Sequence, residues 1–214
     1  FDFMTKYIFE HMTSLAPVCG KTVLELGAGT GRLSYLALKS GARKVTLVDS
    51  SAKAIALERK LFAEEDPALY TLEPSDAFEF KPSDKYDVVF SSGLIEHFKG
   101  EARPAIVRKH VELSRADCIF IHPSDTFYAA LFCRLPAAVR LYGYQEPFSR
   151  SEIDRCLGLC PGIRQIRHTC FYPFYTVPLL HNAEWANRVL DRIGIGKCLG
   201  GETLTAVNVA EVAG

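Results

Sequence analysis

The order of apolar and polar positions along the chain predicts strands and helices that alternate. Residues 3–15 carry apolar side chains at close to the 3.6-residue period of a helix, and Pro17 follows them. Short apolar runs with the length of buried strands then alternate with segments of helical period. The expected strands are 23–26, 44–49, 69–73, 86–90, 118–122, 163–171 and 202–212; the expected helices are 3–15, 32–39, 52–64, 101–114, 149–159 and 182–193.

Three glycines at every second position follow the first expected strand. Residues 23–26 suit a buried strand, and Gly27, Gly29 and Gly31 permit a tight turn and close approach of the backbone to a ligand. A helix is expected to begin directly afterwards, at residue 32, so its first N–H groups face the same crevice. A strand, a glycine turn and a helix N-terminus in this order predict a nucleotide-type cofactor site.

The spacing of the glycines decides between cofactors. The dinucleotide-binding pattern G-x-G-x-x-G requires a third glycine where this chain has Arg32, which argues against NAD. With Glu25 ahead of the glycines, the run resembles motif I of the class I S-adenosylmethionine-dependent methyltransferases, an acidic residue followed by G-x-G-x-G. The resemblance implies S-adenosylmethionine as the cofactor and S-adenosylhomocysteine as the product. It implies cofactor contacts from Glu25, Gly27, Ala28, Gly29 and Gly31.

Asp49 ends the second expected strand, 18 residues after Gly31. A carboxylate at this offset can accept hydrogen bonds from both ribose hydroxyls of an adenosine. We therefore expect Asp49 and the adjacent Ser50 at the cofactor. Helix capping stays open as an alternative, because Asp49, Ser50 and Ser51 all suit the N-cap of the next helix.

Three further positions follow from the resemblance. In this family an Asp after the third strand commonly accepts a hydrogen bond from the adenine amino group, and the next backbone N–H meets a ring nitrogen. Asp76 and Ala77 match that pattern, with a loop Asp that stabilises its own turn as the alternative. Ser92, after the fourth strand, is expected in the same pocket.

Glu96 and His97 come soon after the fourth strand, and the pair matches a pattern frequent in small-molecule methyltransferases of this class. An imidazole at the carboxyl end of that strand could take a proton from an acceptor hydroxyl, which makes His97 the first candidate for a general base. A purely structural histidine is the alternative. Tyr144 ranks second, and the other candidates are His122, Asp125, Tyr128 and Tyr142. No clustered Asp and Asn residues suggest a magnesium site, so we predict no metal.

The resemblance also fixes the expected architecture. It implies an α/β fold with a doubly wound, mostly parallel seven-stranded sheet, helices on both faces, and an antiparallel last strand between the fifth and sixth. In this fold the segment after the fifth strand usually roofs the acceptor pocket, so residues 124–148, rich in aromatic side chains, are expected to form an acceptor-site cap. A plain packing layer and a lipid-facing surface are the alternatives.

Composition narrows the class of protein. A length of 214 residues with 48% hydrophobic content suits one domain over 1–214. Lys plus Arg equals Asp plus Glu at 25 each, which gives no basic excess for nucleic acid, and no apolar run is long enough for a transmembrane helix. The odd count of seven cysteines without a C-x-x-C pair suits a reducing compartment, so we expect a cytoplasmic protein. The chain begins at Phe1, which leaves a preceding segment open.

These observations predict a methyltransferase that moves the methyl group of S-adenosylmethionine to an oxygen or nitrogen of a small molecule. The alternative is a regulatory or partner protein that binds the cofactor without methylating. Macromolecular acceptors also stay open, because a net charge of zero forbids neither protein nor RNA. The sequence leaves the oligomeric state undetermined.

Overall fold

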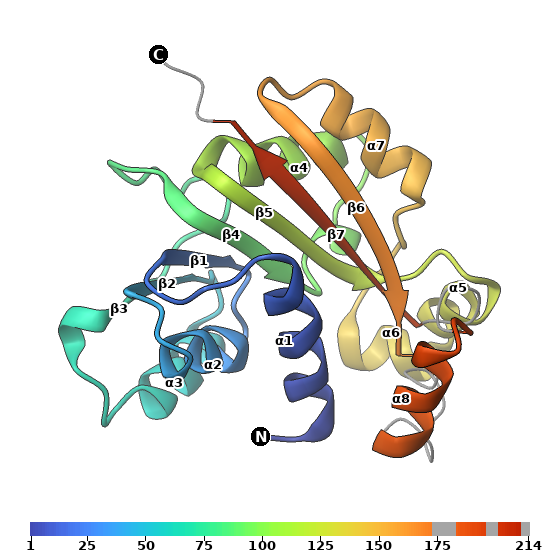
Figure 1. Cartoon of the computed structure of the whole chain (residues 1–214), viewed down its shortest axis with the longest axis horizontal. Helices are drawn as coiled ribbons and strands as arrows, with labels where there is room; N and C mark the ends of the chain where they lie inside the picture. Colours follow the sequence, from blue (N-terminus) through green and yellow to red (C-terminus); the bar gives the residue numbers. More distant parts are fainter. Residues whose placement is uncertain (173–182, 196–200, 211–214) are drawn as a thin grey trace.

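The computed structural model describes residues 1–172, 183–195 and 201–210. Its centre is a seven-stranded sheet in the order β3-β2-β1-β4-β5-β7-β6 (Figure 1). Strands β1 to β5 run parallel, whereas β7 is antiparallel to both β5 and β6. The strands are β1 (Thr22–Leu26), β2 (Lys44–Val48), β3 (Tyr70–Glu73), β4 (Tyr86–Ser92), β5 (Ser114–Pro123), β6 (Ile163–Phe171) and β7 (Glu202–Val209).

Helices cover both faces of the sheet, which confirms the predicted fold class. On one face, α1 (Phe3–Leu15) and α2 (Arg32–Lys39) share a hydrophobic core with the strands, and Phe62 at the end of α3 (Ala52–Leu61) joins it. On the other face, α4 (Ala102–Leu113) and α7 (Arg150–Gly158) form a second core with the opposite side of the same strands. Because successive strand residues point to opposite faces, each central strand contributes to both cores.

The position of β7 follows from its burial pattern. All but one of its residues are buried, as suits a strand that lies between two others and under helices on both sides. Its pairing sets Ile121 opposite Leu204 and Phe171 opposite Glu202, so β5 and β6 are held together only through β7. The predicted place of the last strand is therefore confirmed.

The predicted cap contains two short helices that the sequence pattern did not indicate. Thr126 accepts a hydrogen bond from the N–H of Ala129 and begins α5 (Phe127–Arg134). Pro136 at the first position begins α6 (Pro136–Tyr142), where a missing N–H costs nothing. In Figure 1 both helices lie beyond the carboxyl ends of β4 and β5.

Other boundaries differ slightly from the prediction. Helix α3 ends at Leu61, three residues early, because Phe62 turns into the core and packs against Tyr35 and Tyr70. Helix α8 (Glu184–Arg192) begins after the expected Asn182, which lies outside the described residues, as do positions 211 and 212 of the last predicted strand.

The connection from β3 to β4 contains no helix. Residues 74–85 cross the sheet as turns and extended chain, whereas the connections from β1, β2 and β4 each carry an α-helix. Opposite α1 and α2, this connection is the part of the described chain that covers the β1 to β3 half of the sheet. That half of the sheet carries the polar hollow described below.

Candidate functional site

A hollow of about 490 Å³ lies where β1, β2 and β4 end. This is the edge at which a doubly wound sheet binds ligands, because the strand order reverses there. Six of the predicted cofactor residues line it: Glu25, Gly27, Ala28, Gly29, Asp49 and Ser92. The structure therefore brings together residues from three separate segments that the sequence had proposed for one pocket.

Asp49 connects the ends of β1 and β2. Its Oδ2 accepts a hydrogen bond from the backbone N–H of Gly29 at 2.8 Å, and its Oδ1 accepts one from the N–H of Ser51 at 2.8 Å. A carboxylate offers about four acceptor positions, so two remain for donors of a ligand. A Cβ added at Gly29 would meet no protein atom within 4 Å and would enter the hollow instead. The loop thus leaves room for a ligand beside a fixed carboxylate.

Glu25 connects the end of β1 to the first turn of helix α2. Its Oε2 accepts the hydroxyl of Ser34 at 2.5 Å and the N–H of the same residue at 3.2 Å, in the first turn of α2. Burial raises the pKa of the Glu25 carboxyl to about 8, against the opposing effect of the Ser34 hydrogen bonds. Because helix N-termini leave N–H groups unpaired, this acidic residue fixes the helix to the glycine turn.

The N-terminal helix closes one side of the hollow. Met4, Thr5 and Ile8 line it, so α1 covers the edge of the crevice. Tyr7 is 2% exposed and points away, and its hydroxyl donates to Asp191. Its role is packing, and the three lining residues are ones that the sequence reasoning did not single out.

Four predicted cofactor residues do not line the hollow. Gly31 lies behind the loop, where a Cβ would sit 2.7 Å from Leu47 Cδ2. Ser50 is exposed beside Asp49. Asp76 is exposed and accepts the N–H of Phe78 at 2.8 Å, while Ala77 is buried in the second core. The adenine contacts of Asp76 and Ala77 stay predictions.

His97 and Tyr144 are brought together, although neither lines the hollow. Nδ1 of His97 lies 2.7 Å from the backbone carbonyl oxygen of Tyr144. Because a carbonyl only accepts, Nδ1 carries the hydrogen in the neutral ring, and Nε2 is the basic nitrogen. The Tyr144 hydroxyl donates to Glu146, and the Lys99 ammonium lies 3.7 Å from the centre of its ring. Tyr144 therefore orients His97 through its main chain.

Glu96 is the buried group next to this pair. The backbone N–H of Glu146 donates to the Glu96 carbonyl at 2.9 Å, which fastens the end of the cap to the loop after β4. The Glu96 side chain is fully buried, and Oε2 has no hydrogen-bond partner among the described residues. Burial raises its pKa to about 7. A Cβ at Gly93, which lines the hollow, would lie 3.7 Å from Glu96 Oε1.

Arg103, in helix α4, binds the same end of the cap. Its guanidinium donates to both carboxylate oxygens of Glu152, at 2.7 and 3.0 Å, and to the carbonyl of Glu146 at 3.0 Å. It also lies over the ring of Phe148 at 3.6 Å. A planar guanidinium suits such a bidentate and stacked position, so this buried arginine fixes where the cap meets the sheet.

The other base candidates are not placed at the hollow. His122 is fully buried, its Nδ1 lies 2.8 Å from the Pro123 carbonyl oxygen, and burial lowers its pKa to about 4. Asp125, Tyr128 and Tyr142 are exposed on the cap. No group of three His, Cys, Asp or Glu side chains in the described part of the chain is arranged to hold a metal ion.

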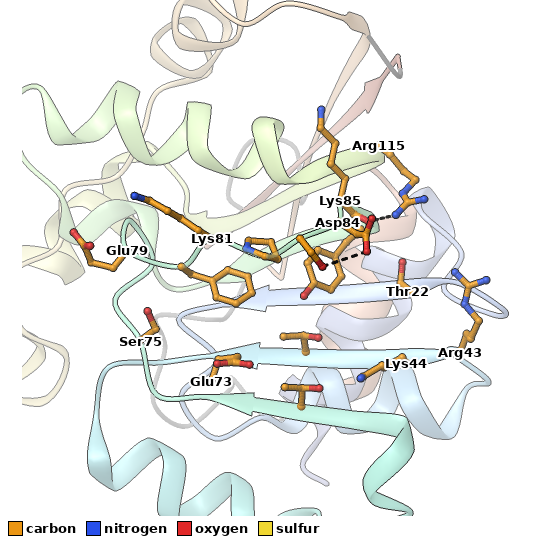
Figure 2. A pocket seen from close by; sticks show the side chains of 16 residues that line it. Thr22, Arg43, Lys44, Glu73, Ser75, Glu79, Lys81, Asp84, Lys85 and Arg115 are labelled. Atoms are coloured by element: carbon orange, nitrogen blue, oxygen red, sulfur yellow. Dashed lines mark hydrogen bonds between the residues drawn. The ribbon is translucent and has the colours of Figure 1, made fainter. Parts of the chain in front are cut away.

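A larger hollow of about 780 Å³ lies on the open half of the sheet (Figure 2). Thr22, Lys44 and Glu73 project into it from the strands, and residues 79–86 of the connection form its other wall. Five Lys and Arg side chains and three carboxylates line it, so it is polar with an excess of basic side chains: Arg43, Lys44, Lys81, Lys85 and Arg115 against Glu73, Glu79 and Asp84. It contains none of the predicted site residues.

Part of the chain matches a family of known proteins. Residues 23–117 match the model of the family described as "Methyltransferase domain". Over 86 residues the chain is 34% identical to the tRNA U34 carboxymethyltransferase of Shewanella amazonensis. That match spans 39% of this chain and only 26% of the relative.

Solved structures of low sequence identity share the fold across nearly the whole chain. Magnesium protoporphyrin IX methyltransferase from Synechocystis PCC 6803, with bound S-adenosylhomocysteine, has a TM-score of 0.66 at 16% identity, over 97% of this chain and 82% of its own. An S-adenosylmethionine-dependent methyltransferase from Mesorhizobium loti also has a TM-score of 0.66 at 16% identity, over 93% and 96%.

The predicted cofactor, S-adenosylmethionine, agrees with the match to a methyltransferase domain and with the ligand bound in the first of these structures. The residues at the glycine loop fit such a ligand. Gly29 has no side chain to fill the hollow, and the Asp49 carboxylate beside it has acceptor positions that no protein donor occupies. None of the described helices has the length and apolar character to cross a membrane.

Proposed function

We propose that this chain is a class I S-adenosylmethionine-dependent methyltransferase that transfers a methyl group to an oxygen or nitrogen of a small-molecule acceptor, and the match of residues 23–117 to a methyltransferase domain supports this. The observation that carries the proposal is the convergence of the Gly29 N–H and the Asp49 carboxylate on a hollow that Gly93 and Leu94 also line. The loop that begins with Gly93 and Leu94 continues to Glu96 and His97, which form hydrogen bonds to the backbone at the end of the 124–148 segment.

The cofactor supplies an activated methyl group on a sulfonium. The chain's own residues then have to bind it, align the acceptor and remove a proton where the nucleophile arrives protonated. We assign binding to Glu25, Gly27, Ala28, Gly29, Asp49 and Ser92.

Proton removal is assigned to His97. The Tyr144 carbonyl fixes the ring so that Nε2 is the basic nitrogen, which is free to accept a proton from an acceptor hydroxyl. Glu96 is the second candidate, because its unpartnered Oε2 is buried beside the loop that leads from the hollow.

Residues 124–148 are proposed as the acceptor cap of a single domain. Three sets of contacts support this role. His97 and Glu96 form hydrogen bonds to the cap backbone, and Arg103 donates to the Glu146 carbonyl and lies over the Phe148 ring. A cytoplasmic location also stays a proposal. It is supported by the free state of all six cysteines that the structure describes.

A transfer assay tests the proposal. The purified chain is incubated with S-adenosylmethionine and a panel of phenols, carboxylic acids and amines, and formation of S-adenosylhomocysteine is measured. Acceptor-dependent product that the Asp49→Ala variant fails to make is the expected result. Bound cofactor without turnover on any acceptor favours the non-methylating protein instead. Turnover only with tRNA replaces the small-molecule acceptor, a result that the partial match to the tRNA-modifying relative makes worth testing.

A further inference from the structure

The large polar hollow on the open half of the sheet shares no lining residue with the hollow at the glycine loop. Its volume of about 780 Å³ lies within the range of small-molecule sites, roughly 300 to 1,000 Å³. Thr22, Thr46 and Thr71 line it from three neighbouring strands, with Thr46 directly opposite Thr71. Parallel strands that lie under helices carry apolar side chains at such positions, so this face of the sheet is suited to polar groups.

Four basic side chains gather at one end of this hollow (Figure 2). Arg43 and Lys44 lie where β2 begins. Lys85 lies just before β4, and Arg115 is the second residue of β5. The Asp84 carboxylate lines the same end. Neither Lys44 nor Lys85 forms an ion pair in the described part of the chain, so their positive charge is available to a ligand.

The two arginines at this end are only loosely paired within the protein. Their ion-pair partner, Asp87, accepts the N–H and the hydroxyl of Thr22 at 2.8 and 2.9 Å. Arg43 and Arg115 approach its oxygens at 3.4 and 3.7 Å, beyond the roughly 2.7 to 2.9 Å of a close charge-assisted hydrogen bond. Nε of Arg115 is buried and has no hydrogen-bond partner among the described residues. Because an unpaired buried donor costs free energy, an anion that accepts from this group would be stabilised.

The opposite end of the hollow carries hydrogen-bond acceptors. Glu73 ends β3, and Ser75 and Glu79 follow it in the connection to β4, together with Lys81 (Figure 2). Neither of these two carboxylates is in an ion pair with a described residue. Ionised carboxylates accept hydrogen bonds and repel phosphates, so this end suits the hydroxyl groups of a ligand. The hollow is therefore cationic at one end and hydrogen-bond accepting at the other.

We propose that this hollow binds a sugar phosphate, either free or within a nucleotide, at a site separate from the cofactor hollow. The phosphate lies at Lys44, Lys85 and Arg115, and the sugar hydroxyls donate to Glu73 and Glu79. Lysine and arginine bind phosphate oxygens through strong charge-assisted hydrogen bonds. A nucleic-acid strand is the less suitable ligand, because its backbone would carry further phosphates towards the carboxylates. The inference does not depend on the proposed methyl transfer.

Calorimetric titration of the full chain tests the inference with ribose 5-phosphate, uridine diphosphate and inorganic phosphate. Both sugar phosphates should bind at least about tenfold more tightly than inorganic phosphate, and the tighter of the two shows whether the sugar is free or part of a nucleotide. Lys44→Gln with Lys85→Gln should weaken their binding at least about tenfold. Glu73→Ala with Glu79→Ala should weaken it as well, but should leave the affinity for inorganic phosphate unreduced.

The matched control is Lys53→Gln with Lys60→Gln. Both lysines are exposed on α3 outside this hollow, so the change removes the same two charges elsewhere. It should leave sugar phosphate binding unchanged, and unaltered thermal unfolding should show that every variant folds. The proposal would be overturned if neither sugar phosphate binds, if inorganic phosphate binds as tightly, or if only an oligoribonucleotide binds. Unchanged affinity in the Lys44 and Lys85 variant, or an equal loss in the control, would also overturn it.

Discussion

The Oδ2 atom of Asp49 accepts a hydrogen bond of 2.8 Å from the backbone N–H of Gly29. The two residues lie in the loops that follow adjacent parallel strands, since Leu26 at the end of β1 pairs with Val48 at the end of β2. This bond fixes the glycine loop and the carboxylate in one geometry before any ligand arrives. Preorganisation of this kind lowers the entropic cost of binding.

The first prediction concerns that carboxylate. Asp49→Ala should weaken S-adenosylmethionine binding at least tenfold, because it removes both the ribose acceptors and the support of the loop. Isothermal calorimetry measures the effect. Asp66→Ala is the matched control, since Asp66 also accepts a backbone N–H, at Ala68, but lies outside the hollow. Unchanged affinity in Asp49→Ala would remove the ribose assignment.

Two glycines of the same loop should respond in opposite ways. Gly29→Val should abolish cofactor binding while the fold survives, because its side chain would enter the hollow and meet no protein atom within 4 Å, so that its cost in stability comes only from the strain of a side chain at φ +57°. Gly31→Ala should instead lower the free energy of unfolding by about 2 to 5 kcal/mol, since φ is +68° and the Cβ meets Leu47 and Glu58. Calorimetry with S-adenosylhomocysteine and denaturant unfolding separate the two effects. Retained affinity in Gly29→Val would mean that the loop does not touch the ligand.

The base assignment is tested by changing four side chains, one of them as a control. His97→Gln should lower kcat by about 10²- to 10⁴-fold with little change in cofactor affinity. Tyr144→Phe should stay close to the native rate, because the residue acts through its carbonyl. His11→Gln is the control, as His11 also lies with Nδ1 near a carbonyl oxygen, that of Tyr7, but away from the hollow. A large loss in Glu96→Gln with a native rate in His97→Gln would move the role to Glu96.

Stability should depend on pH through Glu58. The side chain is fully buried with both oxygens unpartnered among the described residues, and burial raises its pKa from 4.5 to about 7. The folded state holds this proton more tightly than the unfolded state, so stability from this group is present below pH 4.5 and is lost as pH rises towards 7.

The Glu58→Gln variant isolates this effect, because Gln imitates the protonated acid. It should match the native protein near pH 4 and be about 3 kcal/mol more stable at pH 8. Thermal unfolding at both pH values provides the measurement, with the exposed Glu64→Gln as control. A difference between Glu58→Gln and the native chain that stays constant with pH would contradict the raised pKa.

The sequence predicted the parts of this molecule that depend on local order. The run of strands and helices followed from apolar periodicity, and the nearness of Asp49 to the glycine loop followed from the parallel arrangement of β1 and β2, whose carboxyl ends meet at one edge. The place of β7 came from the resemblance to a known family and could not have been read from its own residues.

The remaining features depend on tertiary neighbours. In the sequence Gly31 cannot be told from Gly27 and Gly29. Its contacts with Leu47 and Glu58 in the structure show that it packs against the protein and does not face the hollow. Met4, Thr5 and Ile8 reach the hollow because α1 docks across it, which periodicity does not encode. The two helices of the cap are too short to give a clear periodic signal.

The most direct test is calorimetric titration of the native chain with S-adenosylmethionine, S-adenosylhomocysteine and NAD in parallel. The hollow at the glycine loop predicts one site for each of the two adenosyl sulfur compounds and no heat of binding for NAD. Binding of NAD, or no binding of either sulfur compound, would contradict the assignment of this hollow as the cofactor site.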